Sequence, residues 1–169
     1  MKLPMKGRFV SFMSVLGLMI PGQILAADSS LDVSRIIDKE AAESILEGPV
    51  KTPSPRNVEG KDGYYSKCNY YSVSGRKTLI IRVYEAANGF DPHKELDQVA
   101  ETSGSMRAVA GLGEKARVSS GAESGLPSRV VMLYVVKGNT LITVGLGGFE
   151  DDVAVEKTKS VAQKILAQL

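Results

Sequence analysis

The residue types that carry out nucleophilic or metal chemistry are scarce in this sequence. The 169-residue chain contains one cysteine, Cys68, and one histidine, His93. A thiol–imidazole nucleophile needs hydrogen-bond contact between the two groups and a third group that orients the base. The pattern instead puts Cys68 in the middle of a strand and His93 in the first turn of a helix. One Cys and one His are also too few soft ligands for a zinc site. We therefore predict a buried thiol, with pairing to another chain as the alternative, and a solvated imidazole.

Two other motifs have both a chemical and a structural interpretation. The stretch Gly111–Ala116 has the G-x-G-x-x-A spacing of a dinucleotide fingerprint, which needs a strand before it, a helix after it and an acid about 20 residues further on. This stretch has none of the three, so a glycine bend is the preferred interpretation. The acids Glu150, Asp151 and Asp152 would suit a hard cation, but a solvated helix N-terminus explains them without one. We therefore predict no catalytic, cofactor-binding or metal-binding residues.

Four of the six tyrosines lie in one short stretch, residues 63–73. They are Tyr64, Tyr65, Tyr70 and Tyr71. Aromatic residues and alternation predict a strand here, and successive side chains of a strand point to opposite faces. We expect Cys68 to face the core and Tyr65 and Tyr71 to share the other face. An exposed Tyr65/Tyr71 strip is the candidate binding surface, suited to a protein, a peptide or a glycan; the alternative is that these rings serve packing alone.

The sequence pattern predicts that these residues lie on a mixture of helices and antiparallel strands. A helix capped by Asp38 ends before Gly48, with an earlier start near Asp32 as an alternative. The other predicted helices begin at Asp91-Pro92 and at Glu150. Strands are predicted at 63–73, 78–85, 129–136 and 140–146, with a bend and a short strand in 106–119; residues 51–62 and 120–128 are predicted loops. The order α-β-β-α-β-β-β-α predicts an α+β fold, with helices packed on an antiparallel sheet.

The first 27 residues have the layout of a secretory signal peptide. Three positive charges and no acid precede an apolar run from Phe9 to Ile20, and Pro21-Gly22 and Ala26-Ala27 follow. This is the order of n-, h- and c-regions, with cleavage after Ala26 or Ala27. The alternative is an uncleaved anchor, but the apolar run is shorter than the ~20 residues of a spanning helix. We predict a signal peptide at 1–27 and a single α+β domain at 28–169, in the periplasm or secreted.

The net charge of the chain argues against nucleic acid as a partner. The full chain has 21 basic and 19 acidic residues. Loss of residues 1–27 removes three basic residues and leaves a net charge of −1, so no basic arm for nucleic acid remains. No stable membrane span is expected after cleavage.

Several short motifs together resemble a known kind of protein. They are ILEGPV at 45–50, Cys68-Asn69-Tyr70, GLGEKA at 111–116, KGN at 137–139 and the closing helix. Their order resembles that of small exported bacterial proteins of uncharacterised function with a PsbP-like α/β/α sandwich. The resemblance implies a fold and an envelope location, and no activity. Many such proteins look like lipoproteins, from which this chain departs because it has no Cys near the cleavage region.

These observations favour a binding or assembly module of the cell envelope that is not an enzyme. One alternative is a small envelope hydrolase that uses carboxylates alone. Another is a secreted inhibitor of a second protein, with residues 120–128 as its protruding loop. A pocket with two close carboxylates of raised pKa would favour the hydrolase, and an exposed tyrosine patch would favour the binder.

Overall fold

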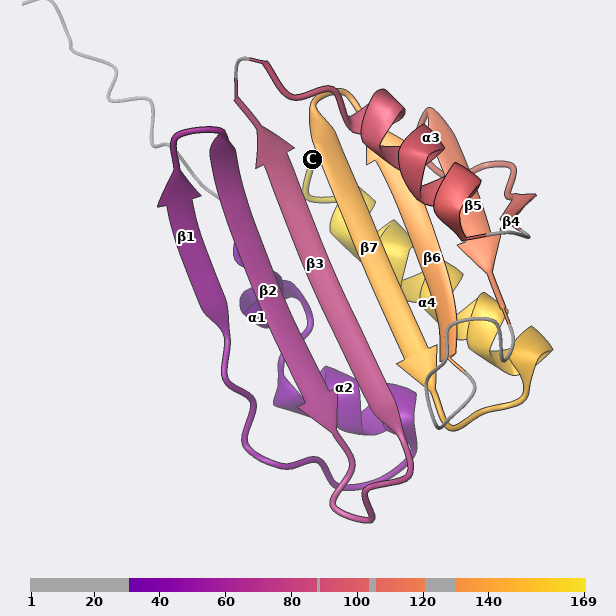
Figure 1. Ribbon diagram of the computed structural model, residues 1–169. Coiled ribbons are helices and arrows are strands. Elements are labelled where there is room, and N and C mark those ends of the chain that lie inside the picture. Colours follow the sequence, from indigo (N-terminus) through magenta and orange to yellow (C-terminus); the bar gives the residue numbers. More distant parts are fainter. Residues whose placement is uncertain (1–30, 88, 104–105, 121–129) are drawn as a thin grey trace, which may run out of the picture.

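The computed structural model describes residues 31–87, 89–103, 106–120 and 130–169. Its described strands form one seven-stranded sheet in the order β1-β2-β3-β7-β6-β5-β4, and every neighbouring pair is antiparallel (Figure 1). The strands are β1 Arg56–Gly60, β2 Gly63–Tyr71, β3 Thr78–Ala86, β4 Met106–Ala108, β5 Lys115–Ser119, β6 Val130–Lys137 and β7 Thr140–Gly147. With the helices described next, this sheet confirms the predicted α+β class.

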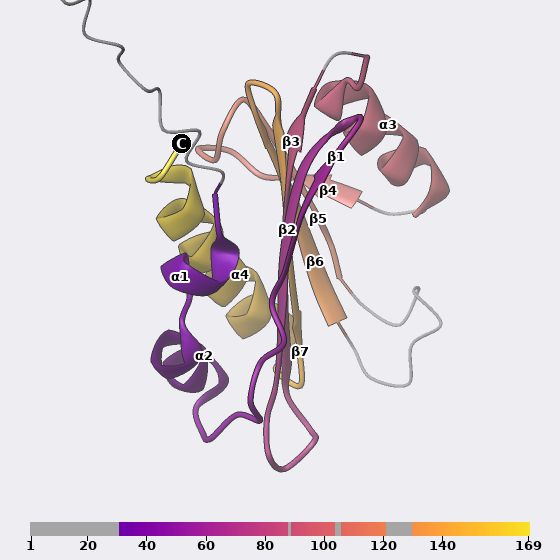
Figure 2. The same ribbon diagram turned by 90° about the vertical axis from the view of Figure 1, so that its left-hand side faces the viewer.

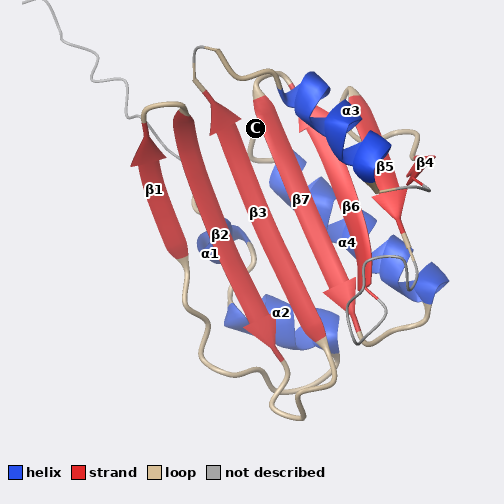
Figure 3. Cartoon of the chain, viewed as in Figure 1, coloured by secondary structure: helices blue, strands red, loops and turns tan. Residues whose placement is uncertain are grey.

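Helices lie on both faces of the sheet. Figure 2 shows α1, α2 and α4 on one face, called here the inner face, and α3 on the opposite, outer face. The helices are α1 Val33–Ile36, α2 Lys39–Leu46, α3 Pro92–Thr102 and α4 Asp151–Leu166. In Figure 3, α3 crosses the sheet near β6 and β5. Within the described part of the chain, the outer side of β1, β2 and β3 is therefore left without a covering helix.

The core lies between the sheet and the three inner helices. Cys68, Ile81, Val144 and Leu133 stand opposite one another across β2, β3, β7 and β6, and all four have no exposed surface. Their alternation with outer residues is what a strand with one packed face requires. The expected burial of Cys68 is confirmed, and this burial raises the pKa of its thiol.

The helix starts and the last hairpin form where the sequence predicts them. Asp38 caps α2 by accepting a hydrogen bond from the backbone N–H of Ala41 at 2.8 Å. Asp91 caps α3, with Pro92 in its first turn. The β6–β7 hairpin turns through Gly138, whose φ of 56° is a conformation that glycine adopts without steric cost.

The element order differs in detail from the prediction. Residues 51–62 were predicted as loop, but β1 runs through Arg56–Gly60. All five of its residues are exposed and it is an edge strand, so no buried alternation marks it. The first helix is two helices, because the chain leaves helical geometry at Ile37, where φ is −117°. The segment 106–119 contains two strands, β4 and β5, rather than one.

Two predictions concern parts of the chain outside the described residues. These are the signal peptide at 1–27 and nearly all of the predicted loop at 120–128. No helix in the described ranges is long and apolar enough to cross a membrane.

Candidate binding surface

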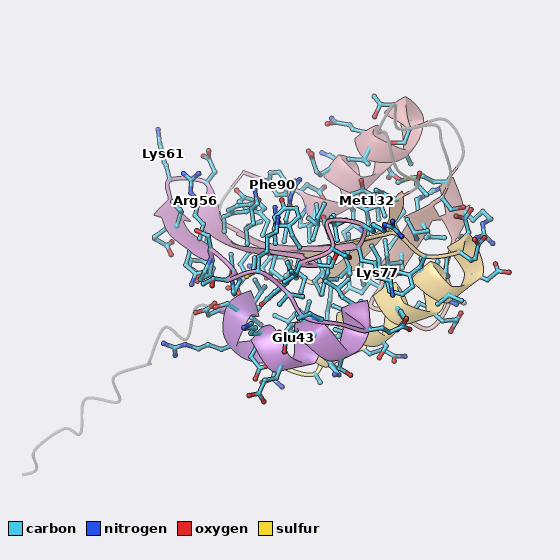
Figure 4. The ribbon with its side chains drawn as sticks, turned by 90° about the horizontal axis from the view of Figure 1, so that it is seen from below. Glu43, Arg56, Lys61, Lys77, Phe90 and Met132 are labelled. Atoms are coloured by element: carbon cyan, nitrogen blue, oxygen red, sulfur yellow. The ribbon has the colours of Figure 1, made fainter. Side chains whose placement is uncertain are left out.

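A groove opens on the outer face, between α3 and the sheet. It has a volume of about 370 Å³. Aromatic side chains dominate its lining, and Figure 4 shows one of them, Phe90, on the same side of the sheet as α3. The lining residues are Tyr65, Arg82, Tyr84, Phe90, Glu95, Val99, Tyr134, Leu141 and Thr143. The groove thus combines an aromatic surface with one cation and one carboxylate.

Strand register builds the floor of the groove. Tyr65 on β2 is directly opposite Tyr84 on β3, which is opposite Leu141 on β7. A second row lies two residues earlier in β3 and places Arg82 opposite Thr143, with Tyr134 on β6 beyond it. Directly opposite residues of an antiparallel pair lie on the same face, so the sheet itself positions these side chains.

Helix α3 forms the wall of the groove and is fastened to the sheet from two sides. Leu96, a residue of α3 itself, is fully buried. Asp97 accepts a hydrogen bond from Lys115 Nζ at 2.5 Å, and Arg117 approaches the same carboxylate oxygen at 3.8 Å. The hydrogen bond from Lys115 lowers the pKa of Asp97 below its ordinary value, with the nearby charges as lesser causes. The wall therefore remains in place only while α3 stays docked on β5 and β6.

One aromatic contact and one hydrogen bond orient the ring of Tyr84 at the centre of the floor. The rings of Tyr84 and Phe90 meet edge to face, with centroids 4.6 Å apart. The hydroxyl of Tyr84 donates a hydrogen bond to the carbonyl oxygen of Asp62 at 2.7 Å. Burial raises the pKa of Tyr84 and of Tyr134. Both phenols are consequently neutral at physiological pH. The one hydroxyl proton of Tyr84 is used in the bond to Asp62, so this oxygen can accept a hydrogen bond from a ligand. The hydroxyl of Tyr134 has no hydrogen-bond partner among the described residues and can donate one.

The charged members of the groove have no ionic partners among the described residues. Arg82 is exposed and its guanidinium makes no hydrogen bond or ion pair there, and the same holds for the half-buried carboxylate of Glu95. A charged group without a partner on an aromatic surface can pair with a charge brought by a ligand. The arrangement is suited to binding through stacking and charge pairing.

The two tyrosines of the predicted surface lie on the outer face but not in the same place. Tyr65 is half-buried and lines the groove. Tyr71 is at the far end of β2 and is 46% exposed, and its hydroxyl accepts a hydrogen bond from Asn69 Nδ2 at 3.2 Å. Six residues of strand separate them by about 20 Å. The groove contains the first and not the second.

Of the residues that line the groove, the sequence pattern indicates only Tyr65 as a binding residue. Arg82 and Tyr84 alternate with the core residues of β3, and Tyr134 does the same in β6. The period of two that predicted the core could also have placed these three on the outer face. Their proximity to Tyr65 depends on the pairing of β3 with β2 and β7, which alternation within a strand does not reveal.

His93 and the glycine motif have structural roles. His93 Nε2 lies 3.1 Å from Glu114 Oε2, and Glu114 Oε1 accepts a hydrogen bond from the N–H of Gly138 at 3.0 Å. The bend at Gly111–Glu114 leads into strand β5, where a dinucleotide fingerprint would lead into a helix. The motif joins the start of α3 to the β6–β7 hairpin. Cys68 is on the inner face, away from His93.

The carboxylates that the structure describes do not form the arrangement that would favour the hydrolase alternative. Among the described residues, the groove is lined by a single carboxylate, that of Glu95. The resolved carboxyl pKa shifts are all downward; they belong to Asp32, Glu47, Asp97 and Glu114. In the described ranges, no group of three or more His, Cys, Asp or Glu side chains is arranged to hold a metal ion.

Comparison with known proteins adds no family to this description. No protein-family model matches the chain, and no curated protein matches its sequence.

Proposed function

We propose that this protein is an exported binding or assembly module of the bacterial cell envelope, which holds its partner on the outer sheet face without catalysing a reaction. The observation that carries this proposal is the groove beside α3, with the rings of Tyr65, Tyr84 and Tyr134. The guanidinium of Arg82, which has no partner among the described residues, adds a positive charge to it. Tyrosine and arginine are among the residue types that are enriched where proteins bind partners.

The proposed site is more specific than the Tyr65/Tyr71 strip. Partner contact centres on the α3 end of β2, where Tyr65 adjoins the groove, and Tyr71 lies outside the contact. The export and envelope location rest on the layout of residues 1–27 and on the resemblance to PsbP-like exported proteins.

The hydrolase remains the second candidate from a different class. It requires two carboxylates within reach of one substrate. Because Glu95 is the sole carboxylate among the described residues that line the groove, we favour the binder. Glu95→Gln leaves a binder intact except for a change in charge preference, whereas it would abolish turnover in a hydrolase built on that groove.

The test uses the protein expressed from its full sequence, purified and immobilised, with an envelope extract of the source organism. Tyr65→Ala and Tyr71→Ala form a matched pair, because both remove an outer-face tyrosine from the same strand. We expect Tyr65→Ala to lose the recovered partner and Tyr71→Ala to keep it, with unchanged circular dichroism in both. Equal recovery by both variants, or no recovery by the unaltered protein, would overturn the proposal.

A further inference from the structure

We propose that the ligand of the outer face is an acidic glycan, a chain of uronate sugars that lies across β1, β2 and β3. This inference rests on the proposed function, since it names the ligand class of the same face. It is carried by a row of cations formed by Arg56, Lys67 and Arg82, called here the cationic row.

Strand register aligns the cationic row across the uncovered side of the sheet. Arg56 on β1 is directly opposite Lys67 on β2, and Lys67 is directly opposite Arg82 on β3. Arg56 and Arg82 are exposed and Lys67 is half-buried, and Figure 4 shows Arg56 on the side of the sheet that carries Phe90. With neighbouring strands about 4.8 Å apart, the three positions repeat at close to the length of one sugar residue.

The cationic row forms no ion pair with any residue that the structure describes. None of its three side chains has a hydrogen bond or an ion pair with another described residue. Like charges that are directly opposite on neighbouring strands destabilise a sheet, and a bound polyanion would relieve that repulsion. The chain as a whole is nearly neutral, with 21 basic and 19 acidic residues, so the positive charge is a local feature of this face.

An apolar row runs beside the cationic row. Val58 on β1 is opposite Tyr65 on β2, which is opposite Tyr84 on β3. Two residues of strand separate the rows, about 6.7 Å. Val58 is 37% exposed, so this row is accessible at the sheet edge. A uronate ring fits the two rows together: its apolar C–H face packs on tyrosine while its carboxylate, at the ring edge, reaches a guanidinium or an ammonium group.

The sheet face favours a glycan over an acidic peptide. The backbone groups of β2 and β3 are already used in ladders with strands on both sides. A peptide that crossed these strands would bury N–H and C=O groups without partners, which is costly. Sugar hydroxyls project from the ring edge and stay in water while the ring face packs.

The groove limits the direction in which the bound glycan can extend. Glu95 lines it from the α3 side, and a carboxylate there repels the acidic groups of a ligand. We therefore expect the uronate carboxylates over β1–β3, and the end of the glycan at α3.

The test measures binding by isothermal titration calorimetry with the protein expressed from its full sequence. The probe is an octamer of galacturonate, and its methyl ester has the same sugar backbone without charge. Octaglutamate serves as the acidic peptide. The double variant Lys67→Gln/Arg82→Gln removes two cations of the row, and Lys164→Gln removes an exposed cation of α4 on the other face as the matched control.

We expect the unaltered protein and Lys164→Gln to bind the octagalacturonate equally, and the double variant to bind at least tenfold more weakly. We expect no binding of the ester, and weaker binding of the acid as salt rises, because these exposed charges are screened. Equal binding of the ester, stronger binding of octaglutamate, or no effect of the double variant would overturn the inference. If octagalacturonate does not bind while the envelope partner still depends on Tyr65, the inference fails and the proposed function stands.

Discussion

Leu96 is the largest buried side chain of the helix that forms the wall of the groove, which makes Leu96→Ala the most informative perturbation of stability. Leu96 has no exposed surface. The substitution removes three carbon atoms, worth about 2.4 kcal/mol at ~0.8 kcal/mol for each buried carbon. Measured Leu→Ala costs reach about 5 kcal/mol where a rigid cavity remains. Helix α3 borders an open groove and can settle toward the sheet, so we expect a loss of about 2–3 kcal/mol in the free energy of unfolding.

Urea denaturation measures that loss, and amide hydrogen exchange locates it. We expect the amides of α3 to lose protection while those of β3 and β7 still exchange through global unfolding. Val153→Ala is the control, because Val153 is 45% exposed on α4 and a surface truncation changes stability by less than about 0.5 kcal/mol. A loss below about 1 kcal/mol for Leu96→Ala, or equal loss of protection throughout the sheet, would refute the assignment of α3 as a separately docked wall.

Three further predictions follow from single contacts. Gly111 and Gly113 both have positive φ, but an alanine Cβ at Gly113 would lie 2.4 Å from a backbone oxygen of β6, whereas at Gly111 it would meet nothing within 4 Å. Thermal melting should therefore show a larger loss of stability for Gly113→Ala than for Gly111→Ala. The second variant has only the backbone cost of about 1–2 kcal/mol. Because the pKa of Asp97 is lowered, its pair with Lys115 stabilises the fold fully at pH values above the ordinary carboxyl pKa of 3.8, and this stabilisation is lost as the pH falls through the folded-state pKa. Titration of the carboxyl group by NMR should give a midpoint below 3.8, and Lys115→Met should raise that midpoint. Because Cys68 is buried and its pKa is raised, iodoacetamide at pH 8 should label it only after unfolding in urea, and labelling of the native protein at the unfolded rate would contradict that burial.

The predictability of the fold differed between its central and edge strands. Aromatic and β-branched residues indicated the four central strands β2, β3, β6 and β7. In β2 and β3 the buried residues also show the period of two that one packed face produces. The edge strand β1 has no packed face, and its five exposed residues look like loop. Its pairing with β2 depends on backbone hydrogen bonds, which every residue type except proline can make.

The candidate site was only partly accessible from sequence. Alternation placed Tyr65 and Tyr71 on one face, but distance along the strand separates them, and α3 contacts the sheet near only one of them. Arg82 belongs to the groove because β3 pairs with both β2 and β7. The sequence of β3 alone does not show which strands it pairs with. The resemblance to PsbP-like exported proteins and the signal peptide stay predictions.

Photo-crosslinking in the source cell tests the central claim most directly. A photoreactive phenylalanine analogue replaces Tyr65 in the groove in one version of the protein and Tyr71 at the far end of the same strand in another. We predict that light produces a discrete covalent adduct from position 65 and none from position 71. Adducts from position 71 alone, or from neither position, would contradict the assignment of the groove beside α3 as the binding surface.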